Sequence, residues 1–221
     1  MPYTLCIDGF NTYKTNTYDN VYKFLEKNNH KISKFSYDTN EDIIKVYQKL
    51  TNNINKNNFD CIIGHSMGGG LLMRYIYDNP KILITTKIIL LMPLIYKREI
   101  YTNISNIEIF KWLYLPKGLF LPSYKLYSHG SILTDTYNLI ALKQIIDMYN
   151  KISLNDDNLI NFLNNNKSVK IIYAKEEAFN TIPKYVLNKI KNFKYVDGLH
   201  ECFNSTDGTK NNFFKTLKKL I

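Results

Sequence analysis

A serine flanked by glycines, Ser66 in the segment 64–68 (GHSMG), has the spacing of a nucleophile held on a tight turn. The mainly apolar residues 59–63 before it predict a buried strand, and 67–77 predict a helix. Such a turn lifts the serine Oγ above the sheet edge and points the Met67 amide at a developing negative charge. The alternative is a glycine-rich turn with a passive serine.

A serine nucleophile needs a base, and the sequence offers four histidines. His200 is the candidate because it lies in a loop after Gly198, directly beyond the last expected strand. His65 is expected to pack beside the turn, and His30 to lie exposed in a polar loop. His129 falls in a different region and is a candidate for lining a substrate pocket.

Apolar strand-like runs alternate with helical segments, which predicts an α/β fold with a mostly parallel sheet and helices on both faces. Strands are expected at 3–7, 31–36, 59–63, 87–91, 170–173 and 194–196. Helices are expected at 17–27, 40–53 (capped by Asn40 or Thr39), 67–77, 136–149, 183–190 and 211–220. The asparagine clusters at 52–58 and 164–166 are expected to be polar loops. The chain is expected to be a single domain over 1–221, with a mainly helical cap inserted at about 97–150.

Three short segments resemble the α/β-hydrolase superfamily, in particular its lipase and esterase branch. Residues 62–70 (IIGHSMGGG) resemble the nucleophile elbow, residues 5–11 (LCIDGFN) the first strand with its oxyanion turn, and residues 198–203 (GLHECF) the final segment with the base. The matches lie at both ends and in the middle, so the resemblance covers most of the chain. It implies the α/β-hydrolase fold and acyl transfer through a catalytic triad.

By this resemblance, residues 174–183 (AKEEAFNTIP) correspond to the loop of the triad acid, which places Glu177 at the acid position. Glu176 takes that place if the loop shifts by one residue, and Asp197 is too close to His200 along the chain. The order Ser66, Glu177, His200 is that of the superfamily. The second oxyanion donor would be the amide of Phe10, beside Met67.

One position departs from the superfamily pattern near the oxyanion turn. Asp8 stands where a histidine is usual. A carboxylate at this place would oppose the oxyanion unless it points away or is paired. Asp8 and the glutamate in place of aspartate therefore keep open a catalytically silent binding protein with the same fold.

The cap region carries many large apolar side chains that would wall an acyl pocket. Trp112, Phe120 and His129 are the candidate substrate-binding residues. They favour a small-molecule or lipid ester with a hydrophobic acyl chain, although the same residues would also serve merely to pack the cap. A thioesterase, a peptidase, a C–C hydrolase and a cofactor-free haloperoxidase remain alternatives, because pocket shape decides the leaving group.

Composition narrows the remaining classes. The net charge is +10, but the lysines are scattered and form no long block, which argues against a nucleic-acid partner and leaves a transient membrane-surface contact open. Three cysteines without metal-ligand spacing predict buried free thiols in a reducing, cytoplasmic setting. No metal or organic cofactor is implied. We expect neither a signal peptide nor a transmembrane anchor, and the sequence leaves the oligomeric state open.

Overall fold

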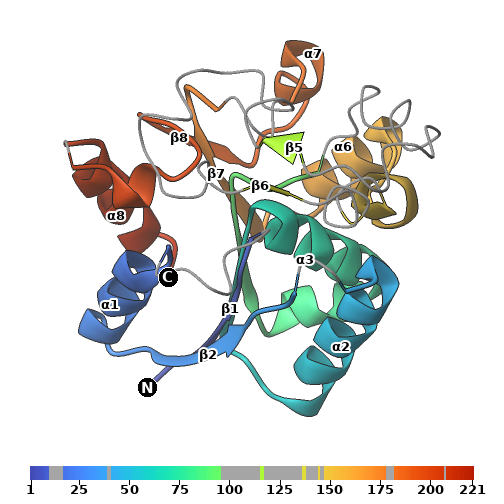
Figure 1. The fold of residues 1–221 in the computed structure, drawn as a ribbon, viewed down its shortest axis with the longest axis horizontal. Helices are drawn as coiled ribbons and strands as arrows, with labels where there is room; N and C mark the ends of the chain where they lie inside the picture. Colours follow the sequence, from blue (N-terminus) through green and yellow to red (C-terminus); the bar gives the residue numbers. More distant parts are fainter. Residues whose placement is uncertain are drawn as a thin grey trace.

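The centre of the protein is a sheet of six parallel strands in the order β2-β1-β3-β4-β7-β8 (Figure 1). The computed structural model describes residues 1–9, 17–38, 41–95, 115–116, 136–137, 144, 147–177, 182–206 and 208–221. The strands are β1 Tyr3–Ile7, β2 Lys31–Phe35, β3 Cys61–His65, β4 Lys87–Leu91, β7 Val169–Ala174 and β8 Phe193–Val196. The predicted α/β class and parallel sheet are therefore confirmed.

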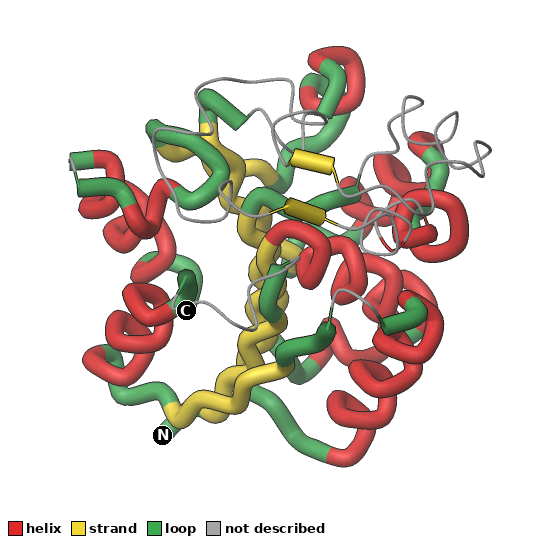
Figure 2. The backbone as a smooth tube through the Cα atoms, in the orientation of Figure 1, coloured by secondary structure: helices red, strands yellow, loops and turns green. Residues whose placement is uncertain are grey.

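Helices cover both faces of this sheet, as Figures 1 and 2 show. One face carries α1 (Asp19–Lys27) and α8 (Thr209–Lys218), and the other carries α2 (Ile43–Lys56), α3 (Ser66–Asp78) and α6 (Asp156–Asn165). The four-residue α7 (Lys184–Leu187) precedes β8, and single helical turns lie at Pro80–Ile84, Met148–Ile152 and Cys202–Asn204. Within the described ranges, no helix combines the length and apolarity needed to cross a lipid bilayer.

Strand side chains alternate between two apolar cores, one on each face. In β1, Leu5 and Ile7 face the core under α2 and α3, whereas Cys6 faces the core under α1 and α8. A strand covered on both faces needs apolar residues at every position, which explains the uninterrupted apolar runs in the sequence. The predicted free, buried thiols are confirmed for Cys6, Cys61 and Cys202.

The order of the strands reverses at β1. The chain passes from β1 to β2 on one side, and then crosses back to β3 on the other side. Because such crossovers are right-handed, the two directions place α1 and α2 on opposite faces. In open parallel sheets, the crevice beyond the strand ends at this reversal is the usual place for a ligand. The segment with Ser66 follows β3 and therefore lies at this point.

Several expected elements differ from the structure. The helix expected at 40–53 begins at Ile43, because the Asp42 carboxylate accepts from the N–H groups of Ile44 (2.9 Å) and Lys45 (3.2 Å). The cap is thus neither Asn40 nor Thr39. Asparagines expected in loops lie in α2 and α6, and α6 itself was not predicted. None of these asparagines is among the buried residues of its helix, and the buried residues of both helices are apolar.

The expected helix at 136–149 is also partly wrong. Thr136–Tyr137 (β6) pairs antiparallel with Leu115–Pro116 (β5), because these short extended segments satisfy each other's backbone groups. A helical turn at Met148–Ile152 follows. Of the rest of the cap expected at about 97–150, the structure describes only Gln144 and Asp147, so its mainly helical character stays a prediction.

Candidate active site

The backbone at Ser66 has a left-handed conformation that serine rarely adopts. Its φ angle is +52°, at the junction where β3 ends and α3 begins. For a residue with a β-carbon, this conformation costs about 1 to 2 kcal/mol, so the surrounding packing must hold it. A strained, non-glycine turn between strand and helix is the geometry of a nucleophile elbow.

Two glycines allow the chain to pass this turn. A β-carbon at Gly64 would lie 2.8 Å from the carbonyl oxygen of Gly68. A β-carbon at Gly68 would lie 2.6 Å from the carbonyl oxygen of Ile7, and closer still to that of Asp8. The first turn of α3 thus packs directly on the backbone at the end of β1, which leaves no room for a side chain.

The end of β1 lies against the nucleophile as well. A β-carbon built at Gly9 would lie 3.1 Å from the Ser66 Cβ. Met67, fully buried, lies in the first turn of α3, where backbone N–H groups have no acceptor within the helix. Phe10, the other expected oxyanion donor, follows Gly9 directly but lies outside the described residues. Gly9, the start of the predicted turn, therefore lies beside the serine, and the role of the Phe10 amide stays a prediction.

His200 and Glu177 meet, as the sequence predicts. His200 Nδ1 lies 2.8 Å from Glu177 Oε2, and the Glu177 side chain is completely buried. Their loops extend the pairing of β7 with β8, since the Glu176 N–H donates to the Gly198 carbonyl at 3.1 Å. Glu176 itself is exposed. Asp197 pairs instead with Lys175, at 2.6 Å.

The acid also tunes the base. Burial alone would lower the pKa of His200, but the negative charge of Glu177 and the hydrogen bond to it outweigh burial and raise that pKa above 6.5. Because Glu177 engages Nδ1, Nε2 is the nitrogen suited to take a proton from a serine. The ring of His200 lies with its centroid 4.7 Å from that of His65, the residue before Ser66. The base therefore lies beside the elbow.

Asp8 is paired rather than aimed at the serine. The Tyr22 hydroxyl donates to its carboxylate at 2.7 Å, and the Ser36 hydroxyl donates to the other oxygen. Burial raises the pKa of Asp8, while these two hydrogen bonds and the charge of Lys34 act in the opposite direction. The carboxylate thus joins β1 to α1 and to the end of β2. This pairing meets the condition under which an aspartate is tolerated at this position.

The other two histidines that the structure describes, His65 and His30, are packed inside the fold. His65 is buried beneath the elbow, as expected. His30 is also buried, and its Nδ1 lies 2.7 Å from the Thr4 hydroxyl, so the prediction that it is exposed is wrong. The turn after α1 brings it against β1, which a polar local sequence does not reveal. His129, Trp112 and Phe120 lie outside the described residues, and their pocket role stays a prediction.

Tyr18 and Tyr22 were not predicted from the sequence to belong to the site. Both are buried, and their hydroxyls bond to His65 and Asp8 respectively. Tyr18 is the N-cap residue of α1, and Tyr22 lies in the first turn of that helix. No local sequence motif identifies such tyrosines. Buried polar groups at strand ends require hydrogen-bond partners, and the two hydroxyls supply them for His65 and Asp8.

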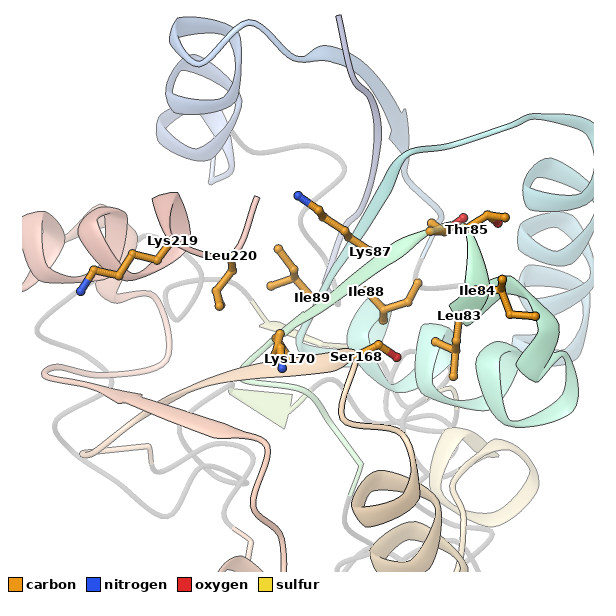
Figure 3. A pocket seen from close by; sticks show the side chains of 11 residues that line it. Leu83, Ile84, Thr85, Lys87, Ile88, Ile89, Ser168, Lys170, Lys219 and Leu220 are labelled. Carbon is orange, nitrogen blue, oxygen red and sulfur yellow. The ribbon is translucent and has the colours of Figure 1, made fainter.

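A separate pocket of about 330 Å³ lies at the opposite edge of the sheet (Figure 3). It is lined by the first residues of β4, by residues around the start of β7 and by the end of the chain, and it includes Lys87, Lys170 and Lys219. The three ammonium groups point in different directions in Figure 3. Because parallel strands begin at this edge, the pocket is remote from Ser66. In the part of the chain that the structure describes, no three His, Cys, Asp or Glu side chains are grouped to hold a metal ion.

Solved structures with little sequence identity share the fold of this chain. A soluble variant of monoglyceride lipase from Saccharomyces cerevisiae, in complex with a substrate analog, matches with a TM-score of 0.68 and 18% identity, over 99% of this chain and 85% of that chain. One of LipS and LipT, two metagenome-derived lipolytic enzymes, matches with a TM-score of 0.67 and 11% identity, over 99% and 92%. The putative non-heme bromoperoxidase BpoC from Mycobacterium tuberculosis H37Rv matches at 0.61 and 12%, over 100% and 91%.

No protein-family model and no curated protein sequence matches the chain. TM-scores of 0.61 to 0.68 support a shared fold, and identities of only 11 to 18% mean that activity must be argued from the site itself. The parallel sheet covered by helices on both faces, the turn at Ser66 after β3 and the likeness to solved lipolytic enzymes agree with the expected fold. The chain has the fold of the α/β-hydrolase superfamily.

Proposed function

We propose that the protein is a serine hydrolase that cleaves a carboxylic ester, with Ser66 as nucleophile, His200 as base and Glu177 as the acid that orients it. One observation carries the proposal: a serine held at a φ angle of +52° shares a sheet edge with a buried histidine–glutamate pair at 2.8 Å. Strain at a serine and burial of a charged pair each cost free energy, and such costs concentrate at functional sites.

The proposed reaction is acyl transfer to water. His200 Nε2 removes the proton from the Ser66 hydroxyl while the oxygen attacks the ester carbonyl, and Glu177 accepts from the Nδ1–H of the resulting imidazolium. The amides of Met67 and Phe10 stabilise the oxyanion. The intermediate then collapses to an acyl-enzyme and expels the alkoxide, which takes the proton from His200. In the second half, His200 removes a proton from water as the water attacks the acyl-enzyme. Collapse of this second intermediate releases the carboxylic acid, and His200 returns the proton to the Ser66 oxygen.

For the substrate, we propose an ester with a hydrophobic acyl chain. Support comes from the apolar cap sequence, with Trp112 and Phe120, and from structural neighbours that include a monoglyceride lipase and lipolytic enzymes. The buried, paired state of Asp8 supports an active enzyme over a silent binding protein, because hydroxyl donors from Tyr22 and Ser36 engage both of its carboxylate oxygens.

Hydrolysis kinetics on a substrate panel test this function. Short- and long-chain p-nitrophenyl esters, an acyl-CoA and a peptide p-nitroanilide are compared on the wild type and on Ser66→Ala. We expect the longer ester to give the highest kcat/KM, and Ser66→Ala to lower it at least about a thousandfold. Preference for the acyl-CoA or the anilide would replace the ester proposal, and equal rates in the two proteins would refute a role for Ser66.

A further inference from the structure

A chain of buried side chains connects the three segments of the candidate site. The Gly9 N–H donates to the Tyr18 hydroxyl oxygen at 3.2 Å, and the Tyr18 hydroxyl makes a short hydrogen bond with His65 Nδ1. On the other side of the ring, His65 Nε2 lies 3.4 Å from the backbone carbonyl oxygen of His200. The chain thus runs from the turn after β1, through the elbow, to the loop of the base.

One proton arrangement satisfies every member of this chain. With hydrogen on Nε2, His65 donates to the His200 carbonyl, and its Nδ1 accepts the hydroxyl hydrogen of Tyr18. The opposite tautomer would face an Nε2 lone pair with carbonyl lone pairs and leave the Tyr18 hydrogen without its acceptor. Burial and the proximity of His200 lower the pKa of His65, which keeps the ring neutral. A neutral ring with Nε2–H is therefore the state that fits the site.

Aromatic packing holds these side chains in place. The Tyr18 ring stacks on Phe203 with centroids 5.6 Å apart, and His65 meets the same ring edge-on at 5.2 Å. Phe203 is fully buried and follows His200 by three residues. The chain is thus clamped between α1 and the loop of the base, and its members have little freedom to rotate.

We infer that Tyr18 and His65 are positioning residues, which fix the oxyanion turn and the base relative to the nucleophile. Gly9 precedes Phe10, His65 precedes Ser66, and the accepting carbonyl belongs to His200, so each hydrogen bond holds a residue at or next to a proposed catalytic group. The inference rests on the proposed function. It adds residues that touch no substrate and act through backbone alignment.

Tyr18→Phe tests the chain by removing one oxygen while keeping the stacked ring. The Gly9 N–H and His65 Nδ1 then lose their common partner, and small misalignments of catalytic groups are costly. We expect kcat on a p-nitrophenyl ester to fall about tenfold to a hundredfold, with KM within about twofold, since substrate contacts remain. Tyr75→Phe is the matched control: Tyr75 is buried in α3, and its hydroxyl bonds to Asn55 at 2.7 Å, away from the site.

Two replacements of His65 separate the two halves of the chain. Asparagine keeps an acceptor near the position of Nδ1 and loses the donor toward His200, whereas glutamine keeps a donor near Nε2 and loses the acceptor. We expect His65→Asn and His65→Gln each to retain more activity than His65→Ala, at unchanged KM. If all three variants have the same kcat as each other, side-chain hydrogen bonding at this position has no part in alignment.

A measurement independent of turnover follows the proton. In protein labelled with ¹⁵N-histidine, His65 should show Nε2–H and an unprotonated Nδ1 throughout, from about pH 5 to about pH 9. A titrating His65, or a proton on Nδ1, would overturn the inference. So would a Tyr18→Phe variant that matches Tyr75→Phe in kcat. A wild type that hydrolyses no substrate of the panel would instead refute the proposed function, which separates the two failures.

Discussion

Replacing Gly68 with alanine should damage the site through the backbone alone. The new β-carbon would lie 2.6 Å from the Ile7 carbonyl oxygen, whereas ordinary van der Waals contact begins at 3.4 Å. The obstructing atoms belong to the backbone of β1, so no side-chain rotation relieves the clash. The first turn of α3 must therefore move away from β1 by about 0.8 Å or more.

The expected magnitudes follow from this displacement. Alanine is favoured over glycine inside a helix by about 1 kcal/mol, and overpacking costs about 1 to 3 kcal/mol. The difference between the two lowers the free energy of unfolding by at most about 2 kcal/mol. The shift also separates the Met67 amide from the turn after β1, which should lower kcat/KM about a hundredfold, as expected for misplacement by about 1 Å.

Urea denaturation and ester hydrolysis measure the two effects. Gly208→Ala is the matched control, because a β-carbon there meets no atom within 4 Å among the described residues. The control should change neither quantity appreciably. A Gly68→Ala protein with wild-type activity would refute the close packing of α3 on β1 as the device that aligns the oxyanion amides.

Substitutions at Glu177, Asp8 and Asp42, two of them with a companion variant, give distinct expectations. Glu177→Gln should lower kcat about a thousandfold or more. Because Glu177 raises the pKa of His200, and the base must be neutral, the loss of activity toward acid pH should move to lower pH in this variant; Glu176→Gln should leave both kcat and the pH profile unchanged. Asp8→Ala should lower the free energy of unfolding by about 1 to 2 kcal/mol in urea titrations, since a buried tyrosine hydroxyl loses its acceptor, and Asp8→Asn should lose less. Asp42→Ala should cost about 1 kcal/mol through loss of the α2 cap, which thermal unfolding would detect.

The contribution of the His200–Glu177 pair to the free energy of unfolding should change with pH in a definite direction. The folded-state pKa of His200 lies above its ordinary value of 6.5. The charged histidine therefore stabilises the fold fully below pH 6.5, and this contribution is lost as the pH rises through the folded-state pKa. Glu177→Gln should remove this dependence, so urea midpoints of the two proteins should converge at alkaline pH. Parallel profiles across the whole range would contradict the pairing as described.

The sequence predicts those features of the fold and of the site whose position depends on a local pattern of residue types. The apolar runs predict the central strands β1, β3, β4 and β7 because these strands are buried on both faces, and the glycines at 64 and 68 mark the elbow because no side chain fits there. The edge strands β2 and β8 are only partly buried, and their sequences mix apolar residues with lysine. His200 is predicted from its place after the last expected strand, and Glu177 from the resemblance of residues 174–183 to the acid loop of the superfamily. The choice between Glu177 and Glu176 depends on which of the two side chains is buried, and a place after a strand does not reveal this.

The unpredicted features depend on contacts distant in sequence. Tyr18 reaches His65 across 47 positions, and the pairing of Asp8 with Tyr22 and Ser36 forms only when α1 and β2 close around β1. The prediction of the α2 cap was wrong for a local reason. Several polar residues precede the apolar face of this helix, and the side chain of each could serve as the cap. None of these choices leaves a periodic signal in the chain.

Covalent labelling tests the central claim, that Ser66 is the activated nucleophile, most directly. The wild type is treated with a fluorophosphonate, and intact mass and peptide mapping locate the adduct. We predict one phosphonyl group on Ser66, strongly slowed labelling in His200→Ala, and none at this site in Ser66→Ala. A wild type that remains unmodified, or an adduct on another residue with Ser66→Ala equally reactive, would contradict the assignment of this serine.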